Sequence, residues 1–171
     1  VFYDPGSGDT PPFGGTTTLL FDTRTQTLLS HHLSLVGTLV NCAGGPTPWG
    51  TWISCEEIVR SAGGSLARDH GYNFEVPASL EGLPVPATPL TAMGRFKHEA
   101  VAVHPPTGIV YQTEDLSDGL LYRFLPNSPG ELAQGGSLQA LAVRGDPSFD
   151  TRNFGGRGVE PGVQMQVEWL D

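Results

Sequence analysis

The sequence contains little positive charge and a single lysine, Lys97, among its 171 residues. Nine basic residues stand against eighteen acidic ones, which gives a formal net charge of −9. Proteins that bind nucleic acid or anionic membranes present a basic face to the phosphates, so this balance disfavours both partners. No apolar run approaches the ~18 residues of a membrane-spanning helix. We therefore expect neither nucleic acid nor a membrane span.

Cysteine and helical patterns are scarce as well. Cys42 and Cys55 allow at most one disulfide, which is far from the density of a disulfide-stapled scaffold. Gly and Pro, which interrupt helices, number 23 and 15. These features exclude a helical bundle, whereas 38% hydrophobic residues argue against disorder.

What remains is a succession of short runs rich in Val, Leu, Ile and aromatic residues, each bounded by turn-forming residues. Such runs predict an all-β fold. Two stretches rich in Pro or Gly, 77–97 and 144–162, are expected to be loop excursions. The expected strands are 16–21, 26–30, 33–40, 50–54, 72–76, 99–103, 108–113, 120–125, 138–143 and 163–169.

Two patterns occur twice. The hairpin pattern of 21–28 returns 82 residues later, at 103–110, which is about twice the ~40–45-residue repeat of propeller blades. Segments 51–57 and 109–115 each end a strand in two acids and are followed by an aromatic strand closed by proline. The first copy then contains a loop insertion at 58–71. We expect a partial β-propeller of about four blades, with a β-sandwich as the alternative.

The chain is expected to be a single propeller fragment, 1–171, truncated at both ends. It begins at Val1 without a basic-then-apolar leader. It stops within an alternating apolar pattern that includes Trp169.

The candidate site residues are one thiol and several carboxylates. Cys42 precedes Gly44-Gly45, and its thiol could be a metal ligand, a nucleophile, a buried apolar group or half of a disulfide with Cys55. Carboxylates crowded at one end of a set of blades would repel one another, and cations such as Ca²⁺ would relieve that repulsion. The sequence therefore indicates a metal cluster. Its carboxylates would be Glu56, Glu57, Glu99, Glu114 and Asp115.

The segments 41–57, 94–103 and 108–115 resemble the PhoX-type alkaline phosphatase family. This resemblance implies a decorated β-propeller that hydrolyses phosphate monoesters with a cluster of calcium and iron ions. It implies a metal-bound oxo or hydroxide as nucleophile and a protein that is secreted or periplasmic. It also implies that Cys42 is the thiolate ligand to iron. The carboxylates around it would be Glu56 or Glu57, Glu99, Glu114 and Asp115, with no catalytic or substrate-binding side chain assigned.

One departure from the family is expected. The family's Arg-x-Glu stretch would lie beyond Asp171, so the fragment alone would have low or no activity. Two other classes stay open. One is a calcium-dependent propeller hydrolase of another specificity, such as a lactonase, and the other is a non-catalytic propeller that binds partners. A thiolate ligand has no evident use in a lactonase, so Cys42 favours the phosphatase.

Overall fold

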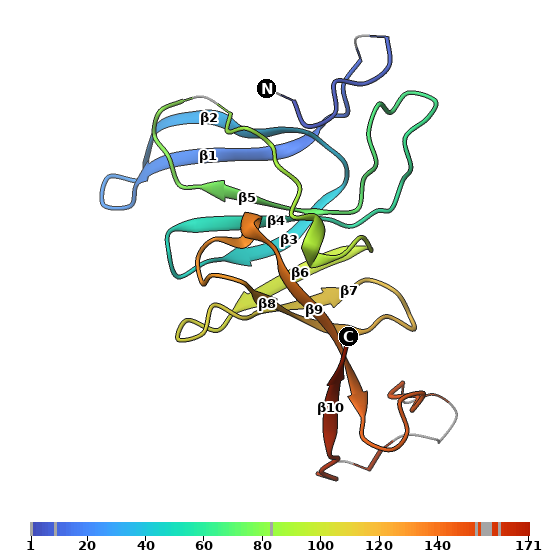
Figure 1. Cartoon of the computed structure of the whole chain (residues 1–171). Coiled ribbons are helices and arrows are strands. Elements are labelled where there is room, and N and C mark those ends of the chain that lie inside the picture. The colour runs from blue at the N-terminus through green and yellow to red at the C-terminus, as the bar shows by residue number, and fades with distance from the viewer. Residues whose placement is uncertain (1, 9, 83, 153, 155–158, 161) are drawn as a thin grey trace.

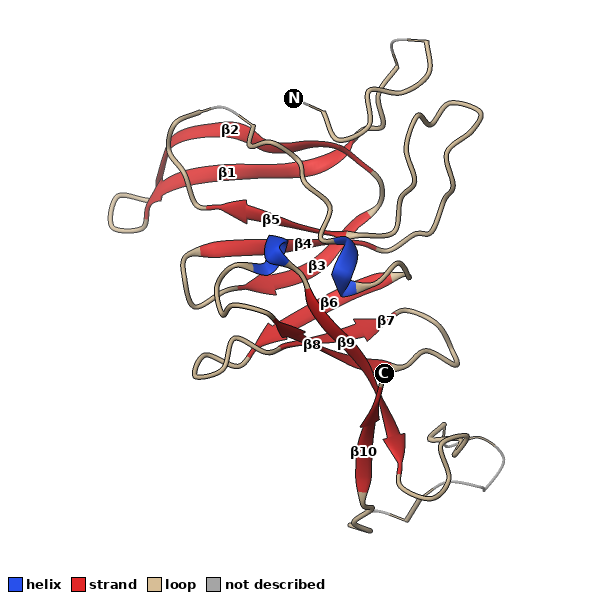
Figure 2. Cartoon of the chain, viewed as in Figure 1, coloured by secondary structure: helices blue, strands red, loops and turns tan. Residues whose placement is uncertain are grey.

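The structure is a computed structural model that describes residues 2–8, 10–82, 84–152, 154, 159–160 and 162–171. These residues form strands and two short 3-10 helices but no α-helix (Figures 1 and 2), which confirms the all-β prediction. The strands are β1 (Gly14–Asp22), β2 (Thr27–Thr38), β3 (Asn41–Pro46), β4 (Thr51–Glu56), β5 (Asn73–Pro77), β6 (His98–Val103), β7 (Val110–Glu114), β8 (Leu121–Pro126), β9 (Gly136–Val143) and β10 (Val167–Leu170), and the 3-10 helices are η1 (Thr91–Met93) and η2 (Leu132–Gln134).

The strands form two sheets. β1 and β2 pair as a hairpin, and the other eight strands lie in the order β10-β9-β8-β7-β6-β3-β4-β5. All neighbours are antiparallel except β3 and β6, which run parallel and pair at Gly44 and Ala100. Figure 1 shows the hairpin at one end of the stack of strands and β10 at the other. Within the described residues the larger sheet does not close on itself, and the expected blade count stays a prediction.

The meanders β3-β4-β5 and β6-β7-β8 are two copies of one unit. Asn41 at the start of β3 pairs with Glu56 at the end of β4, and His98 at the start of β6 pairs with Glu114 at the end of β7. In each copy the third strand pairs with the second. The repeat that the strand-end acids predict in the sequence is therefore present in the structure.

A backbone hydrogen bond closes both copies at the same place. The amide of Glu57 donates to the carbonyl of Val40 at 2.9 Å, and the amide of Asp115 donates to the carbonyl of Lys97 at 3.0 Å. The two residues that follow β4 and β7 are thus held by the same backbone bond. The register of the two meanders matches residue for residue at this end.

Strand β3 is a correction, because no strand is expected from the sequence between 40 and 50. Gly44 has φ of 60°, and a Cβ there would overlap the carbonyl oxygen of Ile53. A Cβ at Gly45 would overlap the carbonyl oxygen of Val101. The glycines therefore let β3 pass close to both neighbours, at the bulge that separates Cys42 from Gly45 in the pairing with β4. A second correction is that the strands expected at 26–30 and 33–40 are one strand, β2.

The expected excursions are partly ordered. Segment 58–71 folds back on itself through antiparallel bridges between Arg60 and His70 and between Gly63 and Leu66. Segment 77–97 contains η1 and a bridge between Phe74 and Pro89. Parts of 144–162, namely 153, 155–158 and 161, lie outside the described residues.

Two apolar clusters hold the sheets. The larger cluster lies where η1 and η2 pack on strands of the eight-stranded sheet. The smaller one joins the N-terminal segment, β2 and β5. Among the described residues, no helix is long and apolar enough to cross a membrane. The larger cluster is Ile53, Cys55, Leu90, Met93, Val101, Val110, Phe124 and Leu132, and the smaller is Tyr3, Leu35, Phe74 and Val76.

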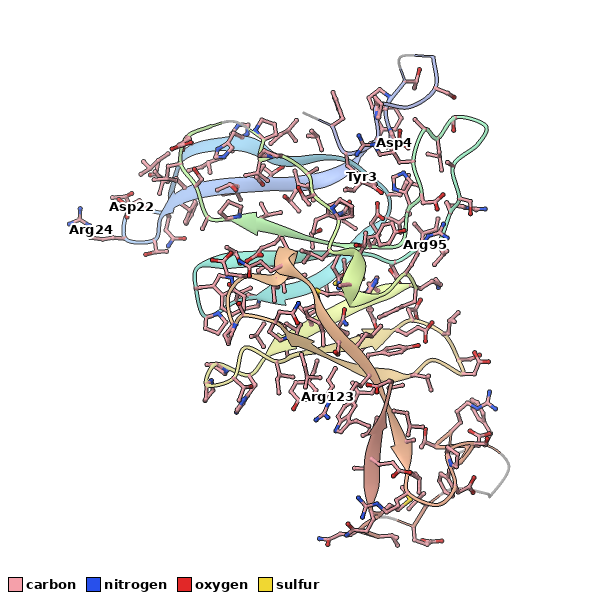
Figure 3. All side chains as sticks on the ribbon, in the orientation of Figure 1. Tyr3, Asp4, Asp22, Arg24, Arg95 and Arg123 are labelled. Carbon is pink, nitrogen blue, oxygen red and sulfur yellow. The ribbon has the colours of Figure 1, made fainter. Side chains whose placement is uncertain are left out.

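A buried charged triad joins the N-terminal segment to segment 58–71. His70 lies between two carboxylates, with Nδ1 2.7 Å from Glu56 Oε1 and Nε2 3.0 Å from Asp4 Oδ2. All three side chains are fully buried. Figure 3 shows Tyr3 and Asp4 beside this segment. Because both ring nitrogens face carboxylates, His70 donates from both of them and carries a positive charge.

The pKa values of the triad move in the directions that this pairing requires. Burial alone lowers the pKa of His70, but its hydrogen bonds to Glu56 and Asp4 outweigh burial and raise it. Burial alone raises the pKa of Asp4, but the hydrogen bonds from His70 and from the backbone together outweigh burial and lower it. The backbone donors are the amides of Gly6, Ala67 and Arg68.

We predict that His70→Ala lowers the free energy of unfolding by about 3–5 kcal/mol, because it leaves two buried carboxylates without their cation. Urea unfolding at neutral pH measures this loss. The matched control is His104→Ala, whose exposed ring pairs only with Thr107 at 2.8 Å and whose loss should cost less than about 0.5 kcal/mol. Equal losses in the two variants would contradict the prediction.

We also predict a pH window for the triad. The raised pKa of His70 makes its contribution complete below its ordinary value of 6.5, and that contribution is lost as pH rises through the raised pKa. The lowered pKa of Asp4 makes its contribution complete above 3.8, and that contribution is lost as pH falls through the lowered pKa. The stability difference between wild type and His70→Gln should therefore shrink at alkaline pH. A difference that grows there would refute the assignment.

Candidate metal centre

The carboxylate of Glu56 makes all of its hydrogen bonds within the fold. It is buried, and both of its oxygens accept hydrogen bonds. With these bonds made, the group faces the loop that precedes β5 and has no oxygen left for another partner. Its partners are the backbone amides of Leu39 (2.8 Å), Gly71 (2.7 Å) and Tyr72 (3.1 Å) and the ring of His70 (2.7 Å).

Glu114 is the equivalent residue in the second meander, and it also accepts hydrogen bonds within the fold. Its Oε2 accepts from the amide of Leu120 and from the hydroxyl of Tyr122, both at 3.2 Å. Burial, together with the charge of Glu114, raises the pKa of Tyr122 to about 12, so this hydroxyl keeps its proton and donates it. The first acid of each pair thus hydrogen-bonds near the start of the following strand: Glu56 to residues that precede β5, and Glu114 to Leu120 and Tyr122 at the start of β8.

The second acid of each pair turns to the other side and meets its counterpart. Side chains alternate along a strand, so Glu57 and Asp115 face away from Glu56 and Glu114. Glu57 lies next to Asp115 and next to the thiol of Cys42. The contact with Glu57, together with the ammonium group of Lys97, lowers the pKa of Asp115. The structure therefore selects Glu57 over Glu56 as the residue near Cys42.

Cys42 and Glu99 bring the first strands of both meanders into this group. Each is the second residue of its strand, and β3 and β6 run parallel side by side. A hydrogen bond from the amide of Ala43 lowers the pKa of the Cys42 thiol, but burial and the charges of Glu57 and Glu99 outweigh it and raise the pKa. The group of Cys42, Glu57, Glu99 and Asp115 is hereafter the carboxylate–thiol cluster.

The two cysteines are both free. They pair directly across β3 and β4, yet they form no disulfide. Burial raises the pKa of Cys55 to about 12, so Cys55 packs in the core as a neutral thiol. The half-buried Cys42 is the cysteine that lies beside carboxylates.

The basic residues before β6 are tied to the fold. Arg95 donates to the backbone oxygens of His70 at 3.0 Å and Arg60 at 2.8 Å, which anchors segment 58–71 (Figure 3). Lys97 Nζ donates to the backbone oxygen of Asp115 at 2.9 Å and to its Oδ2 at 3.0 Å. His98 is buried, and burial lowers its pKa to about 4, so its ring stays neutral at neutral pH.

Comparison with known proteins identifies the family. A family model described as "Alkaline phosphatase PhoX" matches residues 16–171. The chain belongs to the PhoX alkaline phosphatase family. No curated protein matches it. Among solved structures, it is similar to Pseudomonas fluorescens PhoX in complex with vanadate, a transition state analogue, at 21% identity and a TM-score of 0.49.

The PhoX match covers the whole carboxylate–thiol cluster but begins after Asp4. The similarity to the Pseudomonas fluorescens protein covers 76% of this chain and 32% of that one, so the chain spans about a third of its length. The triad adds a residue from outside the matched range.

The donor chemistry of this PhoX chain fits calcium and iron. Carboxylate oxygens suit Ca²⁺, and a thiolate suits iron. Within the part of the chain that the structure describes, no three His, Cys, Asp or Glu side chains are already arranged around one point that could hold a metal ion. The donors lie next to one another in pairs, so cation binding requires side-chain rotation.

We predict that Glu56 stabilises the fold and that Glu57 binds the cation. Glu56→Gln should lower the free energy of unfolding by about 3 kcal/mol or more, because His70 loses a buried charged partner. Glu57→Gln should leave unfolding within about 0.5 kcal/mol, because its side chain is only half-buried. Calorimetric Ca²⁺ titration should instead detect weaker binding in Glu57→Gln. A large loss of stability in Glu57→Gln and weaker Ca²⁺ binding in Glu56→Gln would contradict this prediction.

Proposed function

We propose that the chain carries the metal centre of a phosphatase that hydrolyses phosphate monoesters with calcium and iron ions. The observation that supports this most directly is the carboxylate–thiol cluster. Its thiol and three carboxyl groups come from corresponding ends of two neighbouring meanders, where their charges repel one another. A protein that gathers acids in this way without a cation loses stability, so the arrangement favours a cation-binding role.

Each donor has a role in this proposal. Cys42, once deprotonated, would bind iron, and Glu57, Glu99 and Asp115 would bind calcium or bridge the ions. Because the side chains of Glu57 and Asp115 lie next to each other, these two carboxylates would share a cation. When bound, the cations would supply the charge that orients a phosphate group and would lower the pKa of water for attack.

The charge of the chain makes the proposed function dependent on those cations. A protein of net charge −9 repels a phosphate dianion, and the cluster increases that repulsion locally. Bound cations become the largest local charges and reverse the sign. Substrate binding should therefore require loaded metal. The proposal includes a secreted or periplasmic location, which rests on family resemblance.

The sheet arrangement supports a partial β-propeller as the framework. In a propeller the first strands of neighbouring blades run parallel around the axis, and the loops at one end form a shared site. β3 and β6 are parallel first strands, and the cluster lies at their beginnings. We propose that the two meanders are neighbouring blades.

The test of function measures metal and turnover together. The full-length parent protein, loaded with Ca²⁺ and iron, should hydrolyse a generic aryl phosphate at alkaline pH and lose this activity with a calcium chelator. Cys42→Ala should lose iron by metal analysis and lose at least tenfold in turnover. Cys55→Ala is the matched control, since its buried side chain only packs, and it should keep its metal and most of its activity.

The outcomes separate the candidate classes. Activity that survives both chelation and Cys42→Ala would rule out the cluster mechanism. Turnover of lactones but not of phosphate esters would replace the phosphatase by a lactonase-like hydrolase. Absence of bound iron and calcium in the loaded protein would favour a non-catalytic binding propeller.

A further inference from the structure

The two meanders provide an internal comparison for Lys97. Its equivalent in the first copy is Val40, since both residues accept the backbone hydrogen bond that closes their meander. Val40 is 52% exposed and makes this bond with an apolar side chain. The fold therefore does not need a charged side chain at this position, and the ammonium group of Lys97 requires another explanation.

The side chain of Lys97 hydrogen-bonds to Asp115, the same residue whose amide donates to the backbone carbonyl of Lys97. Nζ donates to the backbone oxygen and to Oδ2 of Asp115, while the amide of Asp115 donates to Lys97. Three hydrogen bonds thus join two residues that are only partly exposed, 34% and 48% for their side chains. A lysine used only for solubility would extend into water.

Asp115 connects this lysine to the carboxylate–thiol cluster. Its side chain lies next to that of Glu57, which in turn lies next to the thiol of Cys42. Arg95, the basic residue nearest in sequence, uses its guanidinium on segment 58–71. Of these two basic side chains, Lys97 is the one that pairs with a member of the cluster.

We propose that Lys97 is the resident counter-ion of the candidate metal centre: it holds Asp115 in the metal-free chain and competes with an incoming cation for that carboxylate. The inference rests on the proposed function, because it concerns the same cluster. The proposal makes Lys97 a positioning residue for Asp115. It also implies that metal binding must overcome the attraction between these two side chains. A cation that takes Asp115 releases the ammonium group, which then stands free beside the site where an anionic substrate would bind.

The test replaces Lys97 by the residue type of its equivalent in the first meander, Val40, as Lys97→Val in the full 171-residue chain. Calorimetric titration with Ca²⁺ at low salt should show binding tightened about threefold, the range expected for loss of a partly exposed ion pair. The gain should shrink in concentrated NaCl, because screening weakens such pairs. Lys97→Arg should bind as wild type does. Arg123→Val, which removes a cation stacked on Trp169 instead, should leave the affinity unchanged.

A second measurement is independent of metal. In the presence of a chelator, Lys97→Val should lower the midpoint of thermal unfolding, and adding Asp115→Asn should restore it, since the uncompensated charge is then removed. If no variant binds Ca²⁺, the proposed metal function fails, and this measurement alone decides the role of Lys97. Unchanged or weaker Ca²⁺ binding in Lys97→Val would overturn the proposal, as would an unchanged midpoint in chelator.

Discussion

A buried carboxylate, Glu56, is the constraint on which this end of the molecule depends. It accepts backbone amides from the turn after β2 and from the start of the β5 segment, and it fixes His70, which in turn fixes Asp4. A carboxylate in the interior is tolerated only when its lone pairs are filled and its charge is balanced. Because these partners come from three segments, namely the N-terminal segment, the turn after β2 and residues 70–72, satisfying one group orders all three.

The candidate metal centre inherits its geometry from this constraint. Once Glu56 turns inward, the alternation of a β-strand sends Glu57 to the opposite side. The second meander repeats the arrangement with Glu114 and Asp115, so the outward acids of both copies reach one another. The candidate site therefore follows from placing two equivalent strand ends side by side. The first strands of both meanders, β3 and β6, run parallel and add Cys42 and Glu99.

The sequence predicts the parts of the fold that local signals carry. Hairpins with polar turns, such as 21–28 and 103–110, and the duplicated strand-end acids are visible in the chain, and both are confirmed. Strand β3 is not, because Asn41–Pro46 lacks β-forming residues and its pairing depends on close approach at two glycines. Asp4 and His70 lie 66 residues apart, and no local pattern links them. The choice between Glu56 and Glu57 depends on which face is buried, which only tertiary packing decides.

Adjacent acids at the two strand ends have different surroundings. Both oxygens of Glu56 accept hydrogen bonds from the chain itself, and Oε2 of Glu114 accepts two such bonds. Glu57 and Asp115 lie next to each other on the other side, and we propose that they exchange their protein partners for a cation more readily. The same logic makes the charge at Lys97 significant, because it stands where the corresponding residue of the first meander, Val40, is apolar.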